Sequence, residues 1–250
     1  TEDFPASRRY LETAAAEGLE EETDIPLAYL AARRGDSATA IEYYRQALRA
    51  RPEAVEPRAA LANLLYQQEH AEESLLHFQK LAQLEPGRAR WHHNIGVILR
   101  EVGRGEEADR AFARAREIDP GTGRVLSLTP FQKDLSSAAH EAKSRKDYQE
   151  AVDKYRLLLG DDPFMTDIRY NLAHTLAAAG RRNRAIREYN RLLRIDPDYA
   201  PAHLNLGILI FNKNRRSQAA ARHFRRYLTL RPDADQAELV RRYLHQIRGW

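Results

Sequence analysis

A proline recurs at nearly constant intervals along the 250 residues of the chain. The spacings are 34, 34, 43, 34 and 35 residues, and each proline follows an apolar segment of helical periodicity. Proline ends a helix because it lacks an amide hydrogen and its ring clashes with the preceding turn. An interval this regular predicts a chain of repeated units. The six prolines are Pro52, Pro86, Pro120, Pro163, Pro197 and Pro232.

Large and small residues keep fixed positions before each proline. An aromatic residue stands eight positions earlier and a small residue four positions earlier again, so both lie on one face of the same helix. This pairing predicts a helix that packs closely against a neighbour. The aromatic residues are Tyr44, Phe78, Phe112, Tyr155, Tyr189 and Phe224. The small residues are Ala40, Ser74, Ala108, Ala151, Ala185 and Ala220.

A second small residue, 24 positions before the proline, predicts another helix in each unit; a one-residue insertion shifts the last of these positions. Residues that tolerate a left-handed backbone stand between the two helices in four units. Each unit is therefore expected to be two antiparallel helices that bury their apolar faces against adjacent units. The second small residues are Ala28, Ala62, Gly96, Ala139, Ala173 and Gly207. The turn residues are Gly35, Gly103, Gly180 and Asn214, with Glu69 and Lys146 as exceptions.

The segment NIGVILREVGRGEEADRAFARAREIDP shows the small residue, turn glycine, alanine, aromatic residue, second alanine and final proline in order. In this it resembles the tetratricopeptide repeat family, and the resemblance extends over residues 21–234. It implies an all-α fold, a right-handed α-solenoid of six helix pairs with N- and C-terminal capping helices. The expected parts are a cap at 1–20, three repeats at 21–122, an inserted connection at 123–131, three repeats at 132–234 and a cap at 235–250. The insertion is apolar, which favours a packed connection over a flexible linker.

The family resemblance also implies a function, because most members are interaction scaffolds that catalyse nothing. Their first helices line a concave face on which a peptide or partner segment lies. Asn94, Asn171 and Asn205 recur two residues before the small first-helix residue and would form a ladder on that face. A carboxamide both donates and accepts, so such a ladder can pair with a peptide backbone of any sequence. The alternative is that these asparagines only hold neighbouring helices together.

Neighbouring first-helix positions carry aromatic and polar side chains, a mixture that suits peptide recognition better than a lipid cavity. The alternative is that they pack the superhelix. Some family members capture a terminal carboxylate with Lys, Asn and Arg residues; Asn63, Asn94 and Lys133 match, but Ala59 and Ser137 replace the other basic residues. Carboxylate capture is thus a minor hypothesis. The additional predicted binding residues are Tyr29, Asn63, Tyr66, His93, Arg100, His140, Tyr170, His174 and Phe211.

Charge is distributed unevenly, which raises two alternative functions. Residues 1–120 contain 16 Lys and Arg against 22 Asp and Glu, whereas residues 121–250 contain 24 against 14. The acidic first half of one copy could meet the basic second half of another and form a homo-oligomer. A second alternative is a nucleic-acid or anionic-lipid partner for an arginine ridge, although charged outer helices usually serve solvation. The ridge contains Arg181, Arg182, Arg184, Arg187, Arg191, Arg194, Arg215, Arg216, Arg222, Arg225 and Arg226.

Several kinds of site are excluded or disfavoured. The chain has no cysteine, so disulfides, thiol catalysis and cysteine-ligated zinc are ruled out. It contains no hydrolase, metalloprotease or nucleotide-binding motif, and His93, His140 and His174 lack a metal-binding spacing. No catalytic residue, metal or cofactor is expected. The chain starts at Thr1 without a signal peptide, leaving room for an upstream leader, anchor or domain, and the sequence does not choose between cytoplasm and periplasm.

Overall fold

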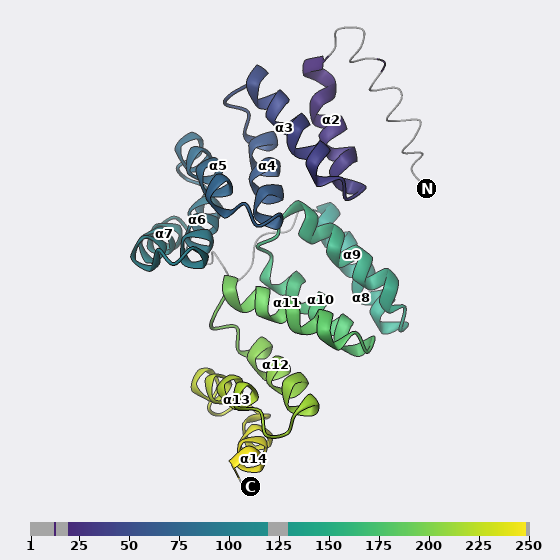
Figure 1. The fold of residues 1–250 in the computed structure, drawn as a ribbon, viewed down its shortest axis with the longest axis vertical. Helices are drawn as coiled ribbons and strands as arrows, with labels where there is room; N and C mark the ends of the chain where they lie inside the picture. Colours follow the sequence, from purple (N-terminus) through teal and green to yellow (C-terminus); the bar gives the residue numbers. More distant parts are fainter. Residues whose placement is uncertain (1–12, 14–19, 120–129, 249–250) are drawn as a thin grey trace. The chain divides into compact units, whose positions relative to one another are not determined.

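The computed structural model describes Thr13, residues 20–119 and residues 130–248. Its described part contains thirteen helices and no strand, which confirms the predicted all-α class (Figure 1). The predicted N-terminal cap at 1–20, except its last residue and Thr13, lies outside the described residues, as do residues 123–129 of the predicted connection. Across the described ranges, no helix has both the length and the apolar character needed to cross a membrane.

The described helices belong to two compact units. Unit 1 comprises residues 1–126 together with the short segment Leu159–Phe164. Each of its helices packs against the next along the chain. Its helices are α2 (Glu20–Arg33), α3 (Ser37–Ala50), α4 (Val55–Gln67), α5 (Ala71–Leu84), α6 (Ala89–Glu101) and α7 (Gly105–Ile118).

Unit 2 comprises residues 127–158 and 165–250. His140 on its first helix packs edge-on against Tyr155 on the second, with ring centroids 5.7 Å apart, and the helices from α10 onward pack each on the next. The helices are α8 (Pro130–Ser144), α9 (Tyr148–Asp161), α10 (Thr166–Ala178), α11 (Arg182–Ile195), α12 (Ala200–Lys213), α13 (Gln218–Leu230) and α14 (Ala237–Arg248). The last three residues of α9 fall in unit 1.

The structure gives the start of the helix after the predicted connection and the extent of the helix in the predicted C-terminal cap. Helix α8 begins at Pro130, two residues inside the predicted connection, because proline suits the first turn of a helix, where its missing amide hydrogen costs nothing. At the other end, α14 occupies most of the segment predicted as a C-terminal cap. Its Val240 and Ile247 are buried in a cluster with Phe224.

The periodic residues form the core. All six periodic aromatic side chains are buried, and so are the small residues one turn before them. The contact is close, because a Cβ atom added to Gly96 would lie 2.8 Å from the ring of Phe112 and one on Gly207 would lie 2.7 Å from that of Phe224. The small first-helix residue is thus the place where the aromatic side chain of the second helix crosses.

The turns inside the helix pairs mostly use left-handed backbone. Gly35, Gly103 and Gly180 have φ values of 79°, 82° and 74°, and the two exceptions of the sequence pattern, Glu69 and Lys146, both have φ 66°. Asn214 does not follow this prediction, since its φ is −146°. There α12 continues to Lys213 and the asparagine side chain accepts a hydrogen bond from the Arg216 amide at 3.0 Å, which closes the turn differently.

Candidate functional site

The first helices of unit 1 hold a segment of the chain itself, Leu159–Phe164, here called the resident segment. Asn63 on α4 donates from Nδ2 to the carbonyl oxygen of Asp161 at 2.8 Å. One turn further along α4, Gln67 Nε2 lies 3.3 Å from the carbonyl oxygen of Leu159 and 3.2 Å from that of Gly160. Two side-chain amides of α4 therefore bond three consecutive carbonyl groups.

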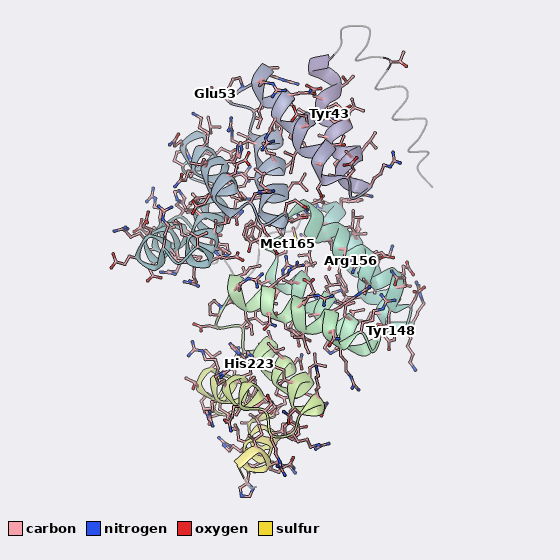
Figure 2. All side chains as sticks on the ribbon, viewed as in Figure 1. Tyr43, Glu53, Tyr148, Arg156, Met165 and His223 are labelled. Carbon is pink, nitrogen blue, oxygen red and sulfur yellow. The ribbon has the colours of Figure 1, made fainter. Side chains whose placement is uncertain are left out.

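The aromatic end of the resident segment is buried. Phe164 is 1% exposed, and its ring lies 4.6 Å from that of Tyr66 and 5.7 Å, edge-on, from that of Phe78. Met165, the next residue, is labelled in Figure 2. Helices α4 and α5 thus contribute one aromatic ring each to the site that receives Phe164.

An acidic side chain of the resident segment faces α6. Asp162 is buried; its Oδ1 accepts a hydrogen bond from the Phe164 amide at 2.9 Å, and its Oδ2 lies 3.6 Å from a guanidinium nitrogen of Arg90. That guanidinium in turn lies 4.4 Å from the ring centroid of Trp91. The arginine offsets the cost of taking a carboxylate out of water.

The structure brings Asn63 and Tyr66, both predicted as binding residues, together on the resident segment. Asn94 lies one helical turn beyond Arg90 on α6, is 1% exposed, and neither of its amide atoms has a hydrogen-bond partner among the described residues. Tyr29 is 47% exposed and accepts a hydrogen bond from Arg33 at 3.2 Å. Among the predicted residues of unit 1, Tyr29 is exposed, whereas Tyr66 and Arg100 are half-buried.

His93 and Arg100, two further predicted residues, meet at Phe112. The His93 ring lies 5.5 Å from that of Phe112, and the Arg100 guanidinium lies 4.4 Å from the same ring. His93 is buried, and burial, followed by the nearby positive charge of Arg100, lowers its pKa to about 4. A neutral histidine is therefore part of the interior of unit 1.

In unit 2, predicted residues gather around Tyr170. Its ring lies 6.2 Å from that of His174 and 5.4 Å from that of Tyr199. Asn205 on α12 donates to the Tyr170 hydroxyl at 3.0 Å, and the Tyr199 hydroxyl donates to Asp167 at 2.7 Å. Burial raises the pKa of Tyr170, so its hydroxyl remains protonated. Tyr170, His174, Tyr199 and Asn205 are called the Tyr170 cluster below.

The Tyr170 cluster is accessible: His174 is exposed, and the other three residues and the adjacent Asn171 are half-buried. Burial and the positive charge of Lys143 lower the pKa of His174. His140 on α8 is also exposed; its Nδ1 lies 2.8 Å from the Ser136 carbonyl, and as the donor in that bond it leaves Nε2 available.

Phe211 has a different place from the other predicted residues. It is fully buried, and its ring lies 6.2 Å from that of Phe224 and 4.8 Å from that of Tyr243. It is part of the packing of α12 against α13 and α14, and it is not carried into the proposed binding surface.

Sequence reasoning missed the partners supplied by the chain itself and by neighbouring helix positions: Gln67, Arg90, Phe164 and Tyr199. A signal for Phe164 was present, because the residue after the repeat proline is elsewhere polar or glycine. The corresponding residues are Glu53, Gly87, Gly121, Asp198 and Asp233. An aromatic side chain at a turn that normally faces water indicates burial against something.

Comparison with known proteins finds several distant relatives. The chain is 27% identical over 156 residues to anaphase-promoting complex subunit 3 of Schizosaccharomyces pombe, covering 62% of this chain and 22% of that protein. It is 24% identical over 201 residues to protein O-mannosyl-transferase TMTC1 of Homo sapiens, covering 80% of this chain and 22% of the relative. The chain thus spans about a fifth of the length of these curated relatives.

Two family models match the chain, and a solved structure is similar to it. A crystal structure of a tetratricopeptide repeat protein from Parabacteroides merdae matches with a TM-score of 0.49 and 16% identity, covering 98% of this chain and 93% of that one. Two family models, both described as tetratricopeptide repeat, match residues 25–89 and 59–122, and residues 142–206. With most of the repeat region matched and the helix pairs as described above, this chain belongs to the tetratricopeptide repeat family.

Proposed function

We propose that this chain is a non-catalytic interaction module that holds a segment of a partner protein along the first helices of unit 2. Proteins of this family generally mediate protein–protein interactions and are typically scaffolds without catalytic activity. The observation that carries the proposal is the accessible Tyr170 cluster, which joins two consecutive first helices, α10 and α12.

The bonding expected in unit 2 has a precedent in unit 1. His174 directly follows Ala173, as Asn63 follows Ala62, and Asn63 bonds a backbone carbonyl of the resident segment. His140 follows Ala139 in the same way. Two imidazole groups on α8 and α10 can therefore donate to carbonyl groups of a bound segment, while Asn171 can both donate and accept. Tyr170 and Tyr199 add contact area to these polar groups.

The test is affinity capture from the source organism, followed by mass spectrometry. The site variant carries Asn171→Ala and His174→Ala, and the matched control carries Asn183→Ala and His245→Ala, an exposed asparagine and an exposed histidine of unit 2. A partner captured by wild type and control but lost from the site variant supports the proposal. Its binding segment is then measured directly as a labelled peptide, with the Asn205→Ala variant as a third probe.

An outcome in which the same partners bind the site variant as strongly as wild type overturns the assignment to α10 and α12. Binding would then lie on another surface of the chain. Loss of every partner from site variant and control alike would indicate a folding defect, which circular dichroism of both variants detects.

A second candidate function is binding of a polyanion by seven exposed arginines, called the arginine face. Within α13 there is no acidic residue, and within α11 there is only Glu188, which already pairs with Arg169 and Arg191. Arg226 pairs with Asp198 in the turn after α11. The arginine face consists of Arg184, Arg187, Arg191, Arg194, Arg222, Arg225 and Arg226.

The polyanion candidate is tested by titrating duplex DNA and anionic vesicles at several salt concentrations. Binding through phosphates weakens steeply with salt, with a slope of the order of 0.9 per phosphate neutralised on duplex DNA. Changing Arg222, Arg225 and Arg226 to Ala should reduce that slope. Binding that is absent at low salt, or unchanged by the three substitutions, excludes this face as a polyanion site.

A further inference from the structure

We propose that unit 1 carries a separate binding site for an acidic–proline–aromatic segment, and that a partner of this chemistry binds it by displacing the resident segment. The resident segment reads Leu-Gly-Asp-Asp-Pro-Phe. The inference concerns residues of unit 1 alone and does not depend on the proposed partner site in unit 2.

Unit 1 binds the main chain of the resident segment through contacts that do not depend on the side chains of that segment. Asn63 and Gln67 donate only to backbone carbonyl groups, at 2.8, 3.3 and 3.2 Å. These three carbonyl groups belong to the last turn of α9, where helix carbonyl groups lack partners within the helix, so a segment that ends in a helical turn can make these contacts. The amides therefore provide affinity and direction rather than selectivity.

Selectivity comes from two side chains of the segment placed two residues apart. The carboxylate of Asp162 faces Arg90, whose guanidinium is held over Trp91. The ring of Phe164 lies against Tyr66 and Phe78. A competing segment therefore needs a hydrogen-bond acceptor for Arg90 and an aromatic ring for Tyr66 and Phe78. The proline between the two side chains restricts the backbone and so sets their spacing.

The resident segment leaves part of the binding capacity unused. Asn63 Oδ1 and both amide atoms of Asn94 are buried without a hydrogen-bond partner in the part of the chain that the structure describes. Arg90 and Asp162 are 3.6 Å apart, longer than a charge-assisted hydrogen bond. Leaving buried polar groups unpaired costs free energy. A segment that reaches them would bind more tightly than the resident segment and could replace it.

Plain core packing would look different. A segment that only filled space would make apolar contacts alone. This one buries Leu159 and Phe164, but it also presents carbonyl groups to two side-chain amides of α4 and a carboxylate to Arg90. Such a directed set of polar contacts is what a peptide-binding surface uses.

The experiment uses the full chain and a fluorescent peptide with the sequence of residues 157–166. The resident segment competes with the peptide from within the same molecule, so its binding to unit 1 is first weakened by Phe164→Ala. Fluorescence anisotropy should show the peptide binding this variant at least tenfold more tightly than it binds wild type. Peptides in which the phenylalanine becomes alanine, or the second aspartate becomes asparagine, should bind at least tenfold more weakly than the parent peptide.

A further variant locates the binding. Adding Asn63→Ala and Gln67→Ala to Phe164→Ala should abolish binding, whereas adding Asn183→Ala and Asn190→Ala, exposed residues of α11, should not. Equal binding of all peptides, or equal binding to wild type and a folded Phe164→Ala variant, would show that the resident segment is a packing element and would overturn the proposal.

Folding is controlled independently. Circular dichroism reports whether Phe164→Ala remains helical, and Phe164→Leu, which retains an apolar side chain, takes its place if it does not. Hydrogen exchange of wild type at millimolar peptide supplies a second readout. Slower exchange in α4 and α6 supports displacement, and unchanged exchange there contradicts it. The loss or retention of partners in the His174 variants bears only on unit 2, so the two proposals fail separately.

Discussion

The first helices of unit 1 and those of unit 2 share one framework but leave their surfaces in different states. In both units a small residue lets an aromatic side chain of the second helix cross closely, as at Gly96 and Gly207. In unit 1 the residue after the small position of α4, Asn63, bonds a carbonyl group of the chain's own resident segment. In unit 2 the matching His174 is exposed to solvent.

This difference distinguishes the positions that pack the helix pairs from the position that faces a bound segment. The small and aromatic positions are buried throughout both units, because each helix pair needs them to pack. The residue following the small one varies in type and in exposure. Asn63 is buried and bonds the resident segment, whereas His174 is exposed. At these two matched positions the scaffold therefore carries one filled and one open site.

The largest expected effect that tests this contrast is the loss of Phe164. Phe164→Ala removes a ring that is 1% exposed and should lower the free energy of unfolding of unit 1 by about 3–5 kcal/mol. The matched control is Phe131→Ala in unit 2, whose side chain is 62% exposed and whose loss should cost within about 0.5 kcal/mol. Urea unfolding followed by circular dichroism, to which the helices of both units contribute, measures both. Equal costs would contradict the burial of the resident segment.

Acid pH should weaken unit 1 through His93. Its pKa falls from 6.5 to about 4 in the folded state because it is buried near Arg100, so the unfolded chain binds the proton more readily. Folding stability is thus unaffected above pH 6.5 and decreases between pH 6.5 and 4, by roughly 3 kcal/mol in total. His93→Gln should flatten this part of the stability profile, measured by urea unfolding at each pH. An unchanged slope in the variant would exclude His93 as its origin.

Unit 2 contains a comparable group, His223 on α13, labelled in Figure 2. Burial, then His203 and Arg222, lowers its pKa to about 4, and its Nδ1 lies 3.0 Å from that of His203. His223→Gln is therefore the matched variant in unit 2. The NMR chemical shifts of His93 and His223 during a pH titration then assign each part of the stability lost at acid pH to its unit.

A smaller effect is expected from filling the close helix crossings. Gly207→Ala places a Cβ atom 2.7 Å from the ring of Phe224, which is fully buried and stacked on Tyr243. Overpacking should cost about 1–3 kcal/mol, against a gain of about 1 kcal/mol in helix propensity. Gly96→Ala meets Phe112, whose ring is bordered by the movable side chain of Arg100, so it should cost less. Thermal unfolding of both variants gives the order, and a reversed order would contradict it.

The sequence was sufficient for the repeat but not for the state of its surface. Proline spacing and the small–aromatic pairs depend on contacts between helices close in sequence, so one sequence reveals them. At Glu69 and Lys146 the residue type gave no signal, because both were exceptions to the expected turn residues and yet both adopt the left-handed backbone. At Asn214 the residue type was misleading, because the one-residue insertion changed the length of the turn.

The contact between Asn63 and Asp161 joins residues 98 positions apart. No periodic pattern predicts such a pair, because it joins the second repeat to the end of the fourth, whereas the pattern describes contacts between helices close in sequence. Phe211 shows the same limit in the opposite direction: its register suggested an accessible position, but α14, which is not a repeat helix, brings Tyr243 against it. In both cases the missing information was a contact that the repeat pattern does not describe.

The smallest expected effect compares the two matched positions directly. Asn63→Ala removes the hydrogen bond to the Asp161 carbonyl group and should cost about 0.5–1.5 kcal/mol, visible as faster hydrogen exchange in the resident segment. His174→Ala should change the free energy of unfolding by less than about 0.5 kcal/mol, because the side chain is exposed. If His174→Ala costs as much as Asn63→Ala, the histidine stabilises the fold and the surface of α10 is not open in the sense proposed. If only Asn63→Ala destabilises, one position in the same repeat register supports the fold in unit 1 and remains available to a partner in unit 2.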